Sequence, residues 1–317
     1  MAREDYVPVA GDDWYERRRE DAEGRFFRGV ADQGPRKGEG GSTRQGIYCL
    51  TADGQLLVYN NAGQDPAVMR DVLRQGLELW AKLPEGRRRA GAVEVGGPGK
   101  IDTRYTRTPP AGGLIVNVYT RILDRKEGEL CRGMCKTAGG ERAARDHLWL
   151  TADEWKSLVP AEARKGDRVP LPAAVAERIL RFHLIDNTRG EPPMWTRDDI
   201  RKQELTLAVT EATELGVRLR LEGAALLATA ADPDKAERGF DVRLRGEIHY
   251  DAGKKAIDRF DVVAVGEHWG EGHFTGGARP GRTPLGVAFE LAAGDTAADR
   301  VPPQAARELQ AYLGKGR

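Results

Sequence analysis

The clearest alternation of hydrophobic and polar positions in the chain lies at residues 240–250. Apolar residues occupy nearly every second position there, and charged residues lie between them. This period of two, with one polar side, is typical of a strand in an antiparallel sheet that has one face in water. A second strand is expected over residues 257–265, after a short turn at residues 251–255 in which Gly253 can take a positive φ. The two strands should pair as a hairpin.

The chain changes character after this hairpin. Residues 266–284 contain six glycines and two prolines, which are poorly tolerated in the interior of a strand. The segment is therefore expected to be a long loop, and long ordered loops in compact domains are often functional. Residues 285–291 alternate again and are expected to form a returning strand.

Shorter alternating segments precede the hairpin, at residues 205–209 and 217–221. Together with the hairpin and the returning strand they give at least five candidate antiparallel strands. We therefore expect residues 204–317 to form an antiparallel β domain, either a sandwich or an open barrel. A short closing helix is expected at residues 303–313.

Residues 91–203 are predicted to form a mixed α/β middle segment. Residues 91–110 are rich in glycine, proline and threonine, which is typical of a linker or an edge element. A nearly continuous apolar run at residues 114–123 predicts a strand buried on both faces. Three helices are expected to follow: one after the capping box of Thr151 and Glu154, one from Pro172, and one capped by Thr196 with Asp199.

A hairpin and a helix are predicted in the N-terminal region. Residues 45–51 and 55–59 are apolar runs joined through Asp53-Gly54, and an Asp-Gly pair in this position is a strong hairpin signal. The helix should begin after Asp65, a good N-cap, because a proline stands at the first helical position and an apolar stripe follows. The aromatic spacing over residues 14–30 predicts a further helix with one buried edge.

The order of hairpin and amphipathic helix, in the sequence GIYCLTADGQLLVYNNAGQDPAVMRDVLRQGLELW, resembles the closing ββα half of a thioredoxin-like domain. The resemblance covers residues 14–83, about a fifth to a quarter of the chain, and implies that residues 1–90 are a degenerate thioredoxin-like region. The family's Cys-x-x-Cys is missing, and Ser-Thr-Arg at residues 42–44 stands where the family has a cis-proline. The resemblance therefore implies the fold without its redox chemistry, and Cys49 is expected to be a buried strand residue.

The composition narrows the classes of partner. The 317 residues include 50 basic and 49 acidic side chains, a net charge of +1, so no nucleic-acid partner is expected. No segment approaches the roughly 20 apolar residues that a membrane-spanning helix needs. No signal peptide is visible after the N-terminal Met-Ala-Arg. We therefore expect a soluble cytoplasmic protein, unless a leader has been removed.

The sharpest candidates for chemistry are four side chains of the glycine-rich segment: Glu267, His268, Glu271 and His273. Carboxylates and imidazoles bind zinc and other divalent metals, and a flexible loop could wrap all four around one ion. The same side chains could instead form a structural polar network, in which Arg279 and Arg282 neutralise the carboxylates and Trp269 covers the end of the sheet. Both interpretations stay open at this point.

A second polar and aromatic cluster lies in the loop at residues 183–195. It could line a pocket together with the glycine-rich segment, or it could form a seam between domains that salt bridges satisfy. The candidate pocket residues are His183, Asp186, Arg189, Trp195, Trp269, Arg279 and Arg282.

A third candidate is the pair Cys131 and Cys135. Their Cys-x-x-x-Cys spacing is not that of a zinc site, which usually requires two pairs, or of a known redox motif. They are expected to be loop thiols or a local disulfide, with thiol redox chemistry as the alternative.

We therefore interpret the chain as an α+β protein that binds an unknown small molecule or protein without catalysis. Its working surface would be the loops at residues 183–195 and 266–284. The alternative is a divalent-metal protein or metal-dependent enzyme, with zinc as an example, that uses the Glu and His side chains as ligands or as acid and base. Thiol redox through the two loop cysteines is the third hypothesis.

Overall fold

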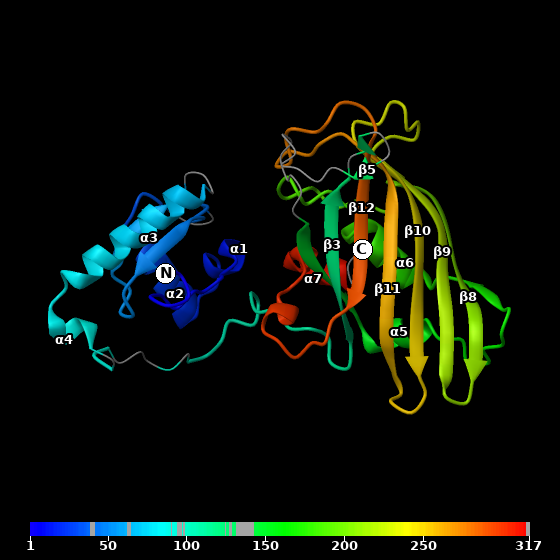
Figure 1. Cartoon of the computed structure of the whole chain (residues 1–317), viewed down its shortest axis with the longest axis horizontal. Helices are drawn as coiled ribbons and strands as arrows, with labels where there is room; N and C mark the ends of the chain where they lie inside the picture. Colours follow the sequence, from blue (N-terminus) through cyan, green and yellow to red (C-terminus); the bar gives the residue numbers. More distant parts are fainter. Residues whose placement is uncertain are drawn as a thin grey trace. The chain divides into compact units, whose positions relative to one another are not determined.

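A computed structural model gives the fold as two compact units, Met1–Arg107 and Thr108–Arg317 (Figure 1). The units combine helices with antiparallel sheets, so the predicted α+β class is confirmed. The structure describes residues 1–38, 42–61, 65–89, 91–93, 97, 99–123, 125–126, 129–130 and 143–314. The candidate redox residues Cys131 and Cys135 lie outside these ranges.

The division of the chain differs from the three predicted segments. The structure has a single division, after Arg107, rather than boundaries at residues 90 and 203. Strands from the predicted middle segment pair with the C-terminal strands in one sheet, so the two segments share one hydrophobic core. A strand buried on both faces can complete a sheet from a distant part of the sequence, which local patterns do not reveal.

The N-terminal unit contains the predicted hairpin and helix. Asp65 caps the long helix by accepting hydrogen bonds from the backbone of Ala67 (2.7 Å) and Val68 (3.2 Å), as expected. The predicted single helix over residues 14–30 is wrong, because Asp21 interrupts it and caps a second helix through the backbone of Gly24. The elements are α1 Asp13–Glu16, α2 Ala22–Ala31, β1 Ile47–Leu50, β2 Leu56–Asn60, α3 Pro66–Ala81 and α4 Glu85–Arg88.

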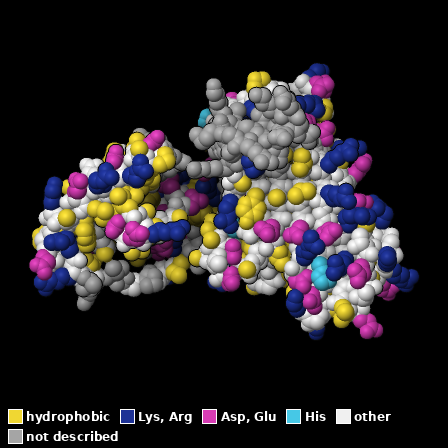
Figure 2. Space-filling view, in the orientation of Figure 1, with side chains coloured by type: hydrophobic (Ala, Val, Ile, Leu, Met, Phe, Trp, Pro, Cys, Tyr) yellow, Lys and Arg dark blue, Asp and Glu magenta, His cyan; other side chains and the backbone are white. Residues whose placement is uncertain are grey.

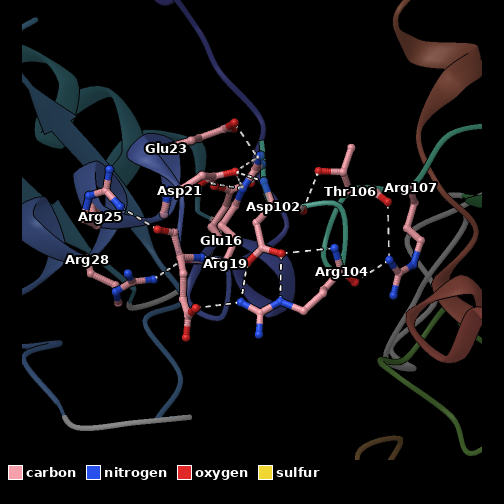
Figure 3. A network of polar contacts seen from close by, with 12 residues as sticks. Glu16, Arg19, Asp21, Glu23, Arg25, Arg28, Asp102, Arg104, Thr106 and Arg107 are labelled. Carbon is pink, nitrogen blue, oxygen red and sulfur yellow. Dashed lines mark hydrogen bonds and ion pairs between the residues drawn. The ribbon is translucent and has the colours of Figure 1, made fainter. Parts of the chain in front are cut away.

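The chain near residue 102, predicted as linker or edge, is fixed to the start of α2 (Figure 3). The Asp102 backbone donates to Asp21 (2.9 Å), and the Glu20 backbone donates to the Asp102 carboxylate (3.0 Å). Arg19 forms a buried ion pair with Asp21 at 2.7 Å, and its hydrogen bonds hold the pKa of that carboxyl well below its usual range. These reciprocal bonds make the segment part of the N-terminal unit.

Cys49 is buried, and the structure accounts for this by the close approach of α3 to β1. Gly76 of α3 lies over it, and a Cβ at Gly76 would be 3.1 Å from the Cys49 Cβ and 2.4 Å from the Tyr6 hydroxyl. Burial raises the pKa of the Cys49 thiol, which disfavours the reactive thiolate. The expectation of a small buried residue is therefore confirmed.

The C-terminal unit is built on one antiparallel sheet of eight strands that does not close into a barrel. These eight strands lie in one sheet rather than in two facing sheets, so the sandwich alternative is not observed among the described residues. The strand order is β6-β3-β12-β11-β10-β9-β8-β7, and a short β4–β5 hairpin (Arg125–Lys126, Glu129–Leu130) stands apart from it. The strands are β3 Leu114–Ile122, β6 Ala144–Leu150, β7 Arg168–Pro170, β8 Ile200–Thr213, β9 Gly216–Ala228, β10 Gly239–Asp251, β11 Ala256–Trp269 and β12 Thr283–Leu291.

Helices cover one face of this sheet. Helices α5 (Ala152–Ser157) and α6 (Ala173–Phe182) lie behind the strands in Figure 1, and their apolar side chains join those of the strands in one core. The capping box of Thr151 and Glu154 that starts α5 is present as predicted. Near the C-terminus the chain forms short helices, η1 Ala298–Arg300, η2 Gln304–Glu308 and α7 Leu309–Tyr312. None of the helices in the described part of the chain is long and apolar enough to span a membrane.

Three local predictions in this unit are corrected. The β10–β11 turn takes its positive φ at Lys255 (51°) rather than at Gly253. Thr196 and Asp199 bond to each other but form a turn that leads into β8, and no helix follows. The predicted loop at 266–284 is shorter, because β11 continues through Trp269 and β12 begins at Thr283.

Candidate functional site

The loops at residues 183–195 and 270–282 meet at one end of the sheet. Glu191 and Phe274 form an isolated antiparallel bridge between them. The guanidinium of Arg189 crosses from the first loop to the second and donates to the carbonyl oxygens of Thr275 (2.5 Å) and Gly270 (3.0 Å). The predicted convergence of the two loops is thus present in the structure.

A buried ion pair holds the first loop in position. The Asp186 carboxylate accepts from Arg189 Nε at 2.7 Å and from the Thr188 hydroxyl at 2.6 Å. The Arg189 and Asp186 side chains are only 4% and 5% exposed. Burial alone would raise the pKa of Asp186, but the bonds from Thr188 and Arg189 outweigh it and keep that pKa below its usual value. Asp186 is therefore a charged structural group rather than an available acid.

His268 lies beside this pair on strand β11. Its side chain faces inward and is buried, whereas the preceding Glu267 faces solvent, as alternation along a strand requires. Burial lowers the pKa of His268 to about 4. The Asp186 carboxylate opposes this shift, whereas the nearby guanidiniums of Arg189, Arg238 and Arg279 add to it. The imidazole is therefore neutral at pH 7.

The second loop brings further side chains to the same place. Arg279 donates to the carbonyl oxygens of Leu123 (3.0 Å) and Pro284 (2.9 Å). Arg282 pairs with Asp234 at 2.8 Å and lies 4.2 Å from the centre of the Trp269 ring. Because both arginines contact groups of the protein itself, their main role in the structure is to hold the loop in place.

The pocket between the loops is small. It leaves about 10 Å³ of free space, roughly enough for one water molecule. Small-molecule sites usually offer about 300 Å³ or more, so this pocket does not accommodate an organic ligand in the observed conformation. Its lining includes Ile122, Asp186, Arg189, His268, Trp269, Gly270, Gly277, Ala278, Arg279, Thr283 and Leu285.

Three predicted pocket residues, His183, Trp195 and Arg282, are not among these lining residues. His183 is buried among the C-terminal elements, where its Nε2 is 3.0 Å from the Tyr312 hydroxyl. Its Nδ1 is 3.3 Å from Asp146 but does not meet hydrogen-bond geometry. Trp195 is buried in the main core and donates to the Leu184 carbonyl at 2.8 Å. His183 and Trp195 therefore stabilise the fold.

The four predicted metal ligands are not brought together. Glu267 and His268 face opposite sides of β11, and His273 is exposed with its ring against Phe274. Glu271 accepts from the Ala278 backbone at 3.0 Å and lies 3.9 Å from Arg189. Within the described ranges, no three His, Cys, Asp or Glu side chains are grouped so that they could hold a metal ion. The alternative polar network is not formed as expected either, because Arg282 pairs with Asp234 and Arg279 donates to backbone carbonyl oxygens.

Sequence reasoning missed Arg238, which lies next to the pocket. It is buried, donates to the Pro193 carbonyl at 2.6 Å, and lies 3.9 Å above the Trp195 ring. Burial lowers its pKa to about 10, and no described carboxylate forms an ion pair with it. Arg238 ends a loop of mixed charge, where nothing in the sequence distinguishes it from its exposed neighbours.

Comparison with known proteins adds no identity. No protein-family model, no curated protein and no solved structure matches this chain.

Proposed function

We propose that the C-terminal unit is a non-catalytic binding module that presents the loop at residues 270–282 to a protein partner. The proposal rests on Phe274, whose side chain is 68% exposed. The loop that carries it is held in place by hydrogen bonds to the rest of the unit. Aromatic anchors on preorganised surfaces contribute much of the binding energy in protein interfaces, because little conformational freedom is lost on association.

The surroundings of Phe274 support this function. Its backbone pairs with Glu191, and the next residue, Thr275, accepts the bond from Arg189. The ring of His273 packs edge-on against Phe274, with the centroids 4.4 Å apart. The same two loops also carry exposed charged side chains, Glu191 and Glu271. An apolar centre with a polar rim is the usual anatomy of a protein-binding patch.

The same contacts favour binding over catalysis. The charged side chains that line the pocket, Asp186, Arg189 and Arg279, are engaged by hydrogen bonds within the protein. General acid–base chemistry needs a group that can reach a substrate proton, and the space beside these groups is about 10 Å³. The loop tip is therefore the better candidate for the working surface.

The proposal is tested by selecting peptides from a random display library on the full chain. We expect the selected peptides to bind the Phe274→Ala variant about 30-fold or more weakly, as for a central interface residue. The matched control is Phe26→Ala, since Phe26 is an exposed aromatic in the N-terminal unit. Selected peptides that bind Phe274→Ala as tightly as the wild type, or a library that yields no binder, would refute the proposal.

A further inference from the structure

The sheet face opposite α5 and α6 carries a second candidate site. The core residues Leu244, Val262 and Phe289 point toward the helices, so the alternate residues of the same strands point to the other face. This outer face is turned toward the viewer in Figure 1. Figure 2 shows apolar side chains gathered in its middle, with Lys and Arg side chains beside them.

A groove of about 310 Å³ lies on this outer face. Its apolar floor is a cross-strand row, because Val263 of β11 pairs with Ala288 of β12 on one side and with Arg245 of β10 on the other. Val263 is 51% exposed. The volume falls within the range of small-ligand sites, and the groove residues are Arg220, Arg245, Gly246, Glu247, Arg259, Asp261, Val262, Val263, Ala288 and Phe289.

The charges of the groove are unequal. Arg259 pairs with both Glu247 (2.8 Å) and Asp261 (2.6 Å), so these three side chains neutralise one another in part. The Arg245 side chain makes no hydrogen bond or ion pair with any residue in the described part of the chain, although its charge helps to lower the pKa of Glu222. Its cross-strand neighbour Glu222 is already paired with Arg168 at 2.6 Å and Arg220 at 3.2 Å. One guanidinium at the edge of an apolar floor is therefore available to an anion.

We propose that this groove binds an amphipathic monocarboxylate, a small fatty acid in chemical class. Its carboxylate would form the two-pronged bond with the guanidinium of Arg245 that this group favours. Its hydrocarbon part would cover Val263 and Ala288, which removes exposed apolar surface from water.

The neighbouring carboxylates restrict the occupant. Glu247 and Asp261 lie in the groove, so a dianionic phosphate or a strongly anionic membrane surface would meet like charges there. A single negative charge is matched by Arg245 alone. Arg259 pairs with Glu247 and Asp261 at one side of the groove. This paired cluster favours a ligand of limited size over a long chain.

The test is calorimetric titration of the full chain with decanoate below its micelle-forming concentration. We expect saturable binding of decanoate and no binding of acetate, which lacks the chain, or of decyltrimethylammonium, which has the opposite charge. Arg245→Met should weaken decanoate binding about 10- to 100-fold through loss of a charge-assisted bond. Val263→Ser should weaken it about 3- to 30-fold through loss of apolar contact.

Arg218→Ala is the matched control, since Arg218 is an exposed arginine of the neighbouring strand β9 and lies outside the groove. It removes the same charge from the same unit and should leave the affinity within about twofold. Equal weakening by Arg218→Ala and Arg245→Met would show unspecific attraction and overturn the proposal. Binding to phosphatidylglycerol vesicles without binding of free decanoate would assign the face to membranes and also overturn it.

Discussion

Replacing Asp186 by alanine is expected to lower the free energy of unfolding of the C-terminal unit by about 3–5 kcal/mol. The substitution leaves the charge of Arg189 buried without its carboxylate partner, because the Arg189 side chain is only 4% exposed. An uncompensated buried charge costs more than the net contribution of the pair. Amide hydrogen exchange of β9, β10 and β11 in the full chain, measured over a urea series, would report this loss for the C-terminal unit alone.

Two further variants separate charge from packing. Asp186→Ala combined with Arg189→Met removes both charges, so most of the stability should return. Glu204→Ala breaks an exposed pair with Lys202 and should change stability by less than about 0.5 kcal/mol. If the double variant is no more stable than Asp186→Ala, the loss arises from the broken links between the loops and not from the buried charge.

The second large effect is on the pH dependence of stability. The pKa of His268 is about 4 in the folded protein because the ring is buried, compared with about 6.5 in the unfolded chain. Between these values the unfolded state binds more protons than the folded state, so acid favours unfolding. Stability should be full above pH 6.5 and should fall by up to about 3 kcal/mol as the pH drops toward 4.

Urea unfolding of the wild type and of His268→Gln between pH 4 and pH 7 isolates this contribution. His147 is also buried, and desolvation lowers its pKa, so part of the slope should remain in the variant. The lowered pKa of Asp186 also makes stability fall in acid, but only at pH values below the usual pKa of an aspartate side chain. Identical slopes for the two proteins over this window would mean that His268 does not titrate as the structure requires.

The period-two pattern predicted the sheet well and its ends poorly. Strands β10 and β11 follow directly from the alternation, but the chain was expected to leave the sheet at Gly266. In the structure Gly266 pairs with Leu285, and a Cβ there would lie 1.9 Å from the Asp241 carbonyl oxygen. This glycine permits a close approach of two strands, which a sequence does not distinguish from a loop glycine. The loop begins at Gly270, whose φ of 80° requires glycine.

The site was predictable in its location and not in its chemistry. The two polar loops were expected to meet, and Asp186, Arg189 and Arg279 do so. The metal hypothesis treated neighbouring residues as if they could face one point, whereas His268 lies in a strand and faces away from Glu267. Arg238 comes from a third loop, and its position depends on strand pairings that single-sequence patterns do not contain. The resemblance of residues 14–83 to a thioredoxin-like half stays a prediction.

The convergence of the two loops is tested most directly by a disulfide between Glu191→Cys and Phe274→Cys. Bridged residues in an antiparallel pair have Cα atoms about 4.5–5.5 Å apart, within the range that a disulfide spans. The three native cysteines would be replaced by alanine in the full chain. A control pair joins Glu191→Cys to Leu215→Cys, since Leu215 lies in the exposed turn at the other end of β9. We expect rapid, nearly complete oxidation of the first pair and none of the second, and persistent free thiols in the first pair would show that the two loops do not meet.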